Sequence, residues 1–341
     1  MRNRIILFGA TGTLGLYVVD RLCAVLNRTE WEVILVGRRK EMRFFDRYFP
    51  LMRYKAMDIT DWDSFYELPW ENVYAVIDLA GSSPMHMAGY DPREYITQNM
   101  MGALNIAEYA RMTDCDRIIY AQDACDLDGY RGSREPLPDD APVRPPLKGD
   151  HAVYATTKIA AAQVFRAYEA EYGILSFILR TPTVLCYMPD SKHLYDGGKP
   201  SIRSYSYLIR RAKAGAALDL WGDPDSKLDV LYVKDFCQMV ELALLAERHV
   251  GGTFNVGSGT AVTFGDLAGH IAREFSPLGH LSEVALRPDC REDLDFVLDI
   301  SRAREELGYE PRYDVRSALE DYKLEMRLNR FADFFHEKLA R

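Results

Sequence analysis

Short apolar runs alternate with helical patterns of apolar and polar residues along the first half of the chain. The apolar runs predict buried strands at residues 5–8, 33–36, 74–79, 117–121 and 175–179. Between them, apolar residues recur with helical spacing, most clearly over residues 14–26, 95–111 and 154–172. Strands that alternate with helices predict an α/β fold, in which helices cover a doubly wound parallel sheet of the Rossmann type.

A glycine-rich turn joins the first predicted strand to the first predicted helix. Glycines permit a tight turn and a close approach of the main chain, and the helix N-terminus offers free N–H groups to a pyrophosphate. We therefore predict a dinucleotide site formed by Gly9, Thr11, Gly12, Thr13, Leu14 and Gly15. The alternative is a strand-to-helix turn that holds no ligand.

After residue 182 the pattern becomes mixed. A helix is expected at residues 205–214, and short strands at 218–221, 230–233 and 253–256. We predict a dinucleotide-binding Rossmann domain over residues 1–182, with segments near 228–257 returning to it. A smaller, mixed α/β substrate-binding domain is expected over residues 183–341.

Two irregular stretches follow predicted strands. Residues 126–150 are rich in proline and charge, and residues 186–200 contain paired glycines, so both predict loops. Both follow the carboxyl ends of strands, which is where open α/β sheets bind ligands.

The end of the second predicted strand bears on which dinucleotide binds. NAD-binding proteins usually carry Asp or Glu there, whereas this chain has Gly37, Arg38 and Arg39. Arginine suits a 2′-phosphate, so Arg38 and Arg39 favour NADP, with NAD as the alternative cofactor. Both arginines could instead be solvated turn residues. Asp58 and Ile59 follow the third strand of the Rossmann pattern, which lies between the strands predicted at 33–36 and 74–79. They are expected at the adenine edge.

Tyr154 and Lys158 are candidates for acid/base chemistry. They lie four residues apart in a helical pattern, so both are on one side of the helix. A neighbouring ammonium favours the phenolate, so Lys158 is expected to lower the pKa of Tyr154 and let it exchange a proton near neutral pH. The alternative is a pair on an exposed helix face. Tyr195 and Lys199 share the spacing, but paired glycines lie between them, and we treat that match as coincidence.

Composition and charge exclude several classes of protein. The formal net charge of −9 argues against a general nucleic-acid-binding protein. The first residues run directly into a strand and no apolar stretch approaches the ~20 residues of a membrane span, so we expect a cytoplasmic protein without a signal peptide. The six cysteines and seven histidines are dispersed, so reduced thiols and no metal site are expected.

The glycine turn, the acid after the third strand and the helical Tyr-x-x-x-Lys pair together resemble the extended short-chain dehydrogenase/reductase family, the NAD(P)-dependent nucleotide-sugar epimerases and dehydratases. Further segments are similar in order along nearly the whole chain, at residues 77–81, 95–102, 179–182, 254–259 and 299–311. By this resemblance, the cofactor would also be lined by Leu79, Ala80, Gly81, Asn99 and Pro182.

The resemblance also implies the chemistry and the assembly. The reaction would be hydride transfer at C4 of the nicotinamide, with Tyr154 as acid/base on a sugar hydroxyl or keto group. Lys158 would hold the nicotinamide ribose and tune Tyr154. The family pairs two long helices of each subunit across a two-fold axis, so a homodimer is expected, with Val164 and Phe165 in the seam.

Several positions after the strand predicted at residues 117–121, the fifth strand of the family pattern, depart from that pattern. Two small hydroxyl residues usually stand there, and this chain has Gln122, expected to face the substrate, and Asp123. A carboxyl group donates a hydrogen bond to the reacting oxygen only when protonated, which burial beside a substrate could promote. Ala124 and Cys125 replace the Asp-Glu pair of the 4,6-dehydratases, which argues against that reaction.

The substrate side departs as well. Thr183 and Cys186 stand where the family often has an asparagine and a glycine, and Thr183 is expected to contact the substrate. Leu228 aligns with an arginine that commonly meets the nucleotide diphosphate. Arg291 is a candidate second diphosphate arginine, and the alternative is a surface salt bridge.

Three functions remain open. The leading hypothesis is an NADP-linked epimerase or keto-reductase acting on a nucleotide sugar or a related polyol. Asp123 and the missing arginine support a dinucleotide-binding sensor or scaffold with little catalysis, whereas the pair of Tyr154 and Lys158 speaks against it. A reductase of a non-nucleotide ketone is the third.

Overall fold

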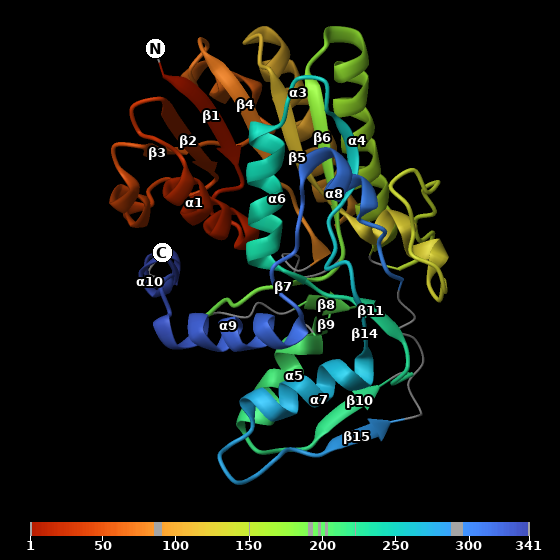
Figure 1. Cartoon of the computed structure of the whole chain (residues 1–341). Coiled ribbons are helices and arrows are strands. Elements are labelled where there is room, and N and C mark those ends of the chain that lie inside the picture. The colour runs from red at the N-terminus through yellow and green to blue at the C-terminus, as the bar shows by residue number, and fades with distance from the viewer. Residues whose placement is uncertain are drawn as a thin grey trace.

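The computed structural model describes residues 2–84, 91–149, 151–189, 194–196, 199–201, 204–221, 223–287 and 296–339 (Figure 1). A sheet with helices on both faces forms the upper part of the view, and a smaller group of helices and short strands lies below it. The chain crosses between the two parts more than once, because helix α6 (Val233–Leu245) returns to the sheet after the first segments of the lower part.

Seven parallel strands form the central sheet, in the spatial order β3-β2-β1-β4-β5-β6-β13. Their bounds are β1 Asn3–Phe8, β2 Trp31–Gly37, β3 Met52–Ala56, β4 Val73–Asp78, β5 Arg117–Asp123, β6 Leu175–Thr181 and β13 Gly252–Asn255. Every neighbouring pair in this sheet runs parallel. The order of the first six strands is that of a Rossmann sheet, so the predicted doubly wound parallel sheet is confirmed.

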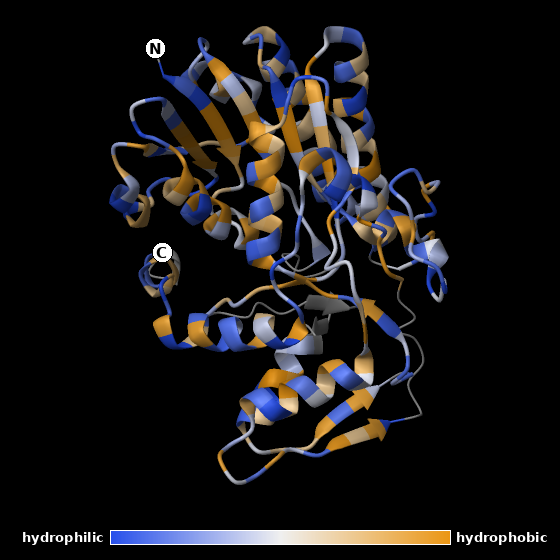
Figure 2. Cartoon of the chain, in the orientation of Figure 1, coloured by the Kyte–Doolittle hydropathy of each residue, from blue (hydrophilic) through white to orange (hydrophobic). Residues whose placement is uncertain are grey.

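Two pairs of helices cover the sheet. α1 (Thr13–Val25) packs beside α6 on one face, and α3 (Gly102–Met112) packs beside α4 (His151–Tyr172) on the other. The inner strands are buried on both faces, which explains why apolar residues predominate in them (Figure 2). No helix within the described ranges has both the length and the apolar composition that a membrane span requires.

The helix predicted over residues 95–111 is interrupted. It consists of α2 (Pro92–Tyr95), a π-helical turn η4 (Ile96–Met101) and α3. A π-helical turn contains one extra residue, and it shifts the side chains that follow around the helix axis. Asn99 lies within this turn and is buried. The prediction had the right position, but a helical period cannot reveal such a turn.

The predicted dimer seam on α4 needs a correction. Phe165 is fully buried against the sheet, and Val164 packs against the same core. Phe165 therefore stabilises the fold of one chain and cannot supply a contact between two chains. The sequence showed an apolar stretch on α4, but it did not show which side of the helix meets the sheet.

A smaller region follows β6. Its elements, with those that lead back to the sheet, are β7 Val184–Leu185, β8 Leu194–Asp196, β9 Lys199–Ser201, α5 Ser204–Lys213, β10 Leu218–Trp221, β11 Lys227–Asp229, β12 Leu231–Tyr232, β14 Ala261–Thr263, α7 Phe264–Phe275, β15 Val284–Arg287, α8 Ser301–Leu307, α9 Val315–Leu328 and α10 Ala332–Leu339. α7 packs against α5 and α9, and the short strands pair two by two. The strand predicted at 253–256 is β13, which pairs in parallel with β6 of the main sheet.

Candidate functional site

A cleft of about 820 Å³ opens at the carboxyl ends of the parallel strands. The turns after β1, β2, β4, β5 and β6 and the start of α4 line it. Of the predicted site residues, the lining includes Gly9, Thr11, Gly12, Thr13, Leu14, Gly15, Arg38, Arg39, Ile59, Leu79, Ala80, Gly81, Asn99, Gln122, Asp123, Tyr154, Lys158, Pro182 and Thr183. Asp58 is not in the lining, and Arg291 lies outside the described residues.

The turn between β1 and α1 leaves no room for side chains at two of its glycines. A Cβ at Gly9, whose φ is +81°, would lie 2.5 Å from the carbonyl of Leu79. A Cβ at Gly15 would lie 2.2 Å from the carbonyl oxygen of Gly9. Gly12 begins α1 without a side-chain cap, so the N–H groups of the first helical turn are open at the edge of the cleft. Such N–H groups bind phosphate oxygens, which fits a pyrophosphate at this turn.

Two arginines continue β2 into the cleft. Arg38 is exposed and Arg39 is half-buried. Asp58, by contrast, closes the turn after β3, because its Oδ1 accepts hydrogen bonds from the N–H and the hydroxyl of Thr60, both at 2.9 Å. Within the described lining, this end of the cleft is therefore basic.

Asn99 fixes the wall of the cleft that follows β4. Its Oδ1 accepts the N–H of Ser82 at 2.8 Å, and its Nδ2 donates to the carbonyl of Ser82 at 3.0 Å and to the hydroxyl of Thr157 at 3.1 Å. Gly81 has a φ of +135°, and a Cβ there would lie 2.6 Å from Asn99 Oδ1. The π-helical turn thus places one amide that joins the cleft wall to α4.

Tyr154 and Asp123 contact each other in the cleft. The hydroxyl of Tyr154 donates to Asp123 Oδ2 at 3.2 Å. The other carboxylate oxygen accepts the N–H of Cys125 at 2.8 Å, which caps the 3-10 helix η5 (Ala124–Tyr130). Asp123 accepts both hydrogen bonds, as an ionised carboxylate does.

Lys158 is bound to the main chain of β5. Its Nζ donates to the carbonyl of Ala121 at 2.8 Å and lies 4.1 Å from the ring centre of Tyr120. Burial lowers the pKa of this ammonium, and the carboxylates of Asp78 and Asp123 oppose that shift. Burial in turn raises the pKa of Asp78 to about 6, although Lys158 counteracts it.

The pKa of Tyr154 lies well above its ordinary value. Burial is the main cause, and the negative charge of Asp123 raises the pKa further. The prediction that Lys158 lowers this pKa is wrong for this geometry, because burial and the carboxylate at the phenol raise it, while the ammonium is held at the carbonyl of Ala121. The neutral phenol is favoured, and in this geometry it is a weaker acid than a free tyrosine.

Residues 5–257 match the family described as NAD dependent epimerase/dehydratase. The chain belongs to this family. The predicted resemblance to the extended short-chain dehydrogenase/reductases is thereby confirmed, and membership in a family of enzymes supports a catalytic role.

Relatives and solved structures agree with this assignment. The UDP-glucose 4-epimerase of Mycolicibacterium smegmatis is 26% identical over 312 residues, which cover 91% of this chain and 94% of that protein. The GDP-L-fucose synthase of Sinorhizobium fredii is 27% identical over 203 residues, 58% of this chain and 62% of that protein. The crystal structure of UDP-glucose 4-epimerase from Thermotoga maritima, with UDP-glucose, has the same fold, with a TM-score of 0.76 and 20% identity over 95% of this chain and 99% of that one.

This member of the epimerase/dehydratase family presents a buried amide to its cleft. The side chain of Gln122 is 2% exposed, and neither Oε1 nor Nε2 has a hydrogen-bond partner among the described residues. Asp126 lies near the amide, but not at normal hydrogen-bonding geometry. An unpaired buried polar group costs about 1–3 kcal/mol, so a ligand that pairs with it recovers that free energy. Thr183, further along the lining, is exposed.

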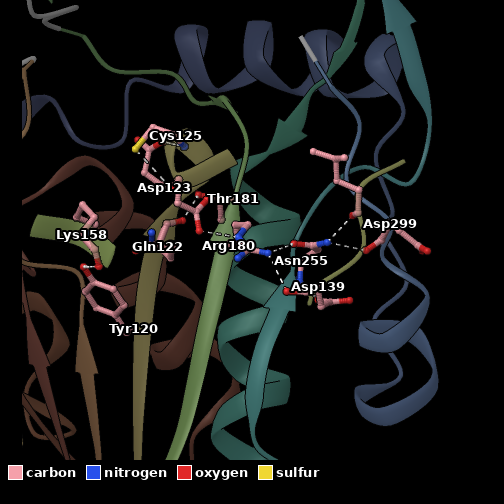
Figure 3. Close-up of polar contacts among 12 residues, drawn as sticks. Tyr120, Gln122, Asp123, Cys125, Asp139, Lys158, Arg180, Thr181, Asn255 and Asp299 are labelled. Atoms are coloured by element: carbon pink, nitrogen blue, oxygen red, sulfur yellow. Dashed lines mark hydrogen bonds and ion pairs between the residues drawn. The ribbon is translucent and has the colours of Figure 1, made fainter. Parts of the chain in front are cut away.

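A buried ion pair holds the loop that follows β5. Arg180 Nε donates to Asp126 Oδ2 at 3.0 Å, and both side chains are buried. The guanidinium also donates to the carbonyl of Asp139 at 3.0 Å and to Asn255 Oδ1 at 3.2 Å (Figure 3). The network joins the predicted loop to β6 and β13. It thereby holds η5 in place, and Asp123 caps the start of η5.

Further residues of the lining, among them His151 and Tyr205, were not predicted as site residues. His151 begins α4, and its ring centre lies 6.2 Å from that of Tyr154. The spacing of three residues before Tyr154 on one helix could have indicated it. Cys186 and Tyr205 also line the cleft. Leu228 does not, and within the described ranges no cluster of His, Cys, Asp and Glu side chains could hold a metal ion.

Proposed function

We propose that the chain is an NADP-dependent oxidoreductase of the epimerase or keto-reductase type, acting on a nucleotide sugar or a related polyol. One observation supports this most: a single cleft joins the glycine turn at Gly12, the basic end at Arg38 and Arg39, and the Tyr154–Lys158 pair. The relatives named above as nucleotide-sugar epimerases are in keeping with such a substrate.

In this proposal the dinucleotide lies along the carboxyl edge of the sheet. Its pyrophosphate contacts the open N–H groups at the start of α1, and its 2′-phosphate contacts Arg38 and Arg39. Ile59 covers the adenine, while Pro182 and Lys158 bound the nicotinamide end. We assign residues 1–182 and the returning segments near 228–257 to this function, and the rest of 183–341 to the substrate.

The cofactor, when bound, supplies hydride exchange at C4 of its nicotinamide ring. Tyr154 is the proton donor to the substrate oxygen once the substrate displaces Asp123 from its hydroxyl, and the resulting phenolate takes the same proton back in the reverse direction. Asp123 orients the hydroxyl of Tyr154 by accepting its hydrogen bond before the substrate binds. Lys158, whose Nζ now donates to the carbonyl of Ala121, would hold the nicotinamide ribose.

On the substrate side, Gln122 and Thr183 bind the sugar or polyol. The amide of Gln122 carries both a donor and an acceptor, which match a hydroxyl group of a substrate. Arg291 keeps its proposed role at the diphosphate. Lys227 is exposed away from the cleft and Leu228 is half-buried, so neither replaces the arginine that the family places there.

A second candidate function is a dinucleotide-binding sensor or scaffold. It is favoured by the contact between Tyr154 and Asp123, because a phenol that is occupied by a carboxylate must be released before it can meet a substrate. A reductase of a non-nucleotide ketone is the third candidate, and the leucine at position 228 favours it.

We also propose a cytoplasmic homodimer formed through α3 and α4. Met112 of α3 is 47% exposed and Tyr172 of α4 is 51% exposed, and Met101, the last residue of η4 directly before α3, is also 47% exposed. Such apolar groups suit a closed two-fold contact. Light scattering at micromolar concentration should give a mass near twice the 39.0 kDa of one chain.

Native mass spectrometry of the purified protein tests the proposed function. We expect a co-purifying dinucleotide, and a nucleotide sugar retained at lower occupancy. The released ligands are then supplied in turn to the protein with NADPH, and the loss of absorbance of the reduced nicotinamide is followed. A protein that retains NADPH but turns over neither nucleotide sugars nor simple ketones would be the sensor.

A further inference from the structure

The C-terminal helix α10 packs against the 3-10 helix η1 (Arg43–Tyr48), which lies between β2 and β3. Glu337 Oε1 accepts the N–H of Arg43 at 2.8 Å, and Oε2 accepts the N–H of Phe44 at 2.9 Å. One carboxylate therefore caps the start of a helix that precedes it by 294 residues. In Figure 1 the C-terminal end of the chain accordingly lies below α1.

Aromatic side chains continue this contact toward the sheet. Phe334 of α10 meets Phe45 of η1 edge-on, with ring centres 6.1 Å apart. Phe45 stacks on Tyr54 of β3, with ring centres 5.3 Å apart and planes inclined by 17°. Phe45 and Phe334 are buried, so the two rings are held by their neighbours on all sides.

Tyr54 is the last of these stacked aromatic residues and lies beside the dinucleotide cleft. Its hydroxyl donates to the carbonyl of Arg39 at 2.7 Å. A Cβ at Gly37 would lie 3.0 Å from this hydroxyl and 2.8 Å from Cγ2 of Thr11, so the end of β2 is enclosed between Tyr54 and the glycine turn. Burial raises the pKa of Tyr54 to about 12, and Glu337 is close enough to contribute.

We propose that α10 is a component of the dinucleotide site, which positions the main chain of Arg39 for the adenosine end of the cofactor through η1 and Tyr54. Glu337 and Tyr54 are positioning residues, because neither is part of the cleft lining. The inference rests on the proposed function, since it needs a dinucleotide whose adenosine half binds beside Arg39. Affinity at that end then depends on the last helix of the chain.

Two substitutions test the link at its two ends. Tyr54→Phe keeps the stacked ring and removes the hydrogen bond to Arg39, and Glu337→Gln keeps the size and removes the charge of the cap. Adenosine 2′,5′-bisphosphate is the probe, because it contains only the adenosine half. We expect its Kd, measured by calorimetry, to rise about three- to tenfold in each variant, as for the loss of one hydrogen bond.

Two control variants make the same kinds of substitution, Tyr to Phe and acid to amide, at other positions of the chain. Tyr309→Phe removes a hydroxyl that donates to the carbonyl of Gly257 at 2.9 Å, and Asp333→Asn removes a charge of α10 that pairs with the exposed Arg47 at 3.0 Å. Both should leave the Kd of the probe within about twofold of the unmodified value, whatever they do to the urea midpoint.

The outcomes separate this inference from the proposed function. If the unmodified protein binds neither NADPH nor NADH, the proposed function fails and this inference fails with it. If it prefers NADH, ADP replaces the probe and the same shifts are expected. If the unmodified protein binds its dinucleotide and both variants bind the probe equally well, α10 is only structural and the inference alone is wrong.

Discussion

The two ends of the cleft are built from different materials. Apart from Arg38 and Arg39, the dinucleotide end is formed largely by main chain: the turn at Gly9 and Gly15, the start of α1, and the wall at Gly81. The substrate end is made of side chains at the ends of strands, among them Gln122 and Asp123. Main-chain sites depend on the absence of side chains, so glycine spacing reveals them. Side-chain sites depend on which groups meet in space.

The largest effect is expected at the side-chain end. Tyr154→Phe keeps the ring and removes the proton, so turnover should fall by about 10²–10⁴-fold in steady-state kinetics while NADPH binding is retained. Asp123→Asn still accepts the phenol and should keep partial activity, whereas Asp123→Ala should lose it. If turnover is indifferent to changes at both positions, only the binding-protein function survives.

The buried ion pair offers the next test. Arg180→Met leaves the carboxylate of Asp126 buried without its partner, and we expect about 3–5 kcal/mol to be lost from the free energy of unfolding in urea. Replacing Asp126 by Leu as well should recover much of this loss. Arg304→Met, which breaks an exposed ion pair with Glu310, should cost less than about 1 kcal/mol. Equal losses in both single variants would contradict the role given to Arg180.

The main-chain end is tested with one methyl group. Gly15→Ala places a Cβ against the carbonyl of Gly9, which should cost about 1–3 kcal/mol and raise the Kd of NADPH at least about tenfold. Gly269→Ala is the control, because its Cβ would meet the flexible Arg273 at 3.6 Å on a helix remote from the cleft. Fluorescence titration that found both variants unchanged would show that the turn does not hold the cofactor.

The smallest effect concerns the choice of cofactor. Arg38→Ala should raise the Kd of NADPH about tenfold and leave that of NADH within about twofold, since only the 2′-phosphate loses its partner. Lys227→Ala removes an equal charge outside the cleft and should change neither Kd. Equal affinities of the unmodified protein for NADPH and NADH would refute the preference for NADP.

Much of the fold could be predicted from the sequence, because the patterns that indicate its strands and helices are local. The inner strands are buried on both faces and read as apolar runs, and strand-turn-helix spacing located the glycine turn. The edge strand β3 was harder, since Arg53 and Lys55 interrupt it. An edge strand exposes part of its surface, and its composition therefore resembles that of a loop.

The rest depended on contacts between distant segments. Arg180 and Asp126 are 54 residues apart, and nothing in either neighbourhood indicates that they pair. The carboxylate of Asp123 was found, but neither the burial of Tyr154 nor its contact with Asp123 could be predicted, and burial first and the carboxylate second raise the tyrosine pKa. The side of α4 that faces the sheet, and with it the burial of Phe165, also required the three-dimensional packing.

The late position of β13 in the sequence affects how the protein folds during its synthesis on the ribosome. β13 pairs with β6, yet residues 182–251 must be synthesised between them. Until β13 emerges, β6 is an open edge, and Arg180 has not met Asn255. Open parallel edges recruit other nascent chains. We therefore expect fragments that stop before residue 252 to aggregate, and slower translation of this interval to lower the yield of folded protein.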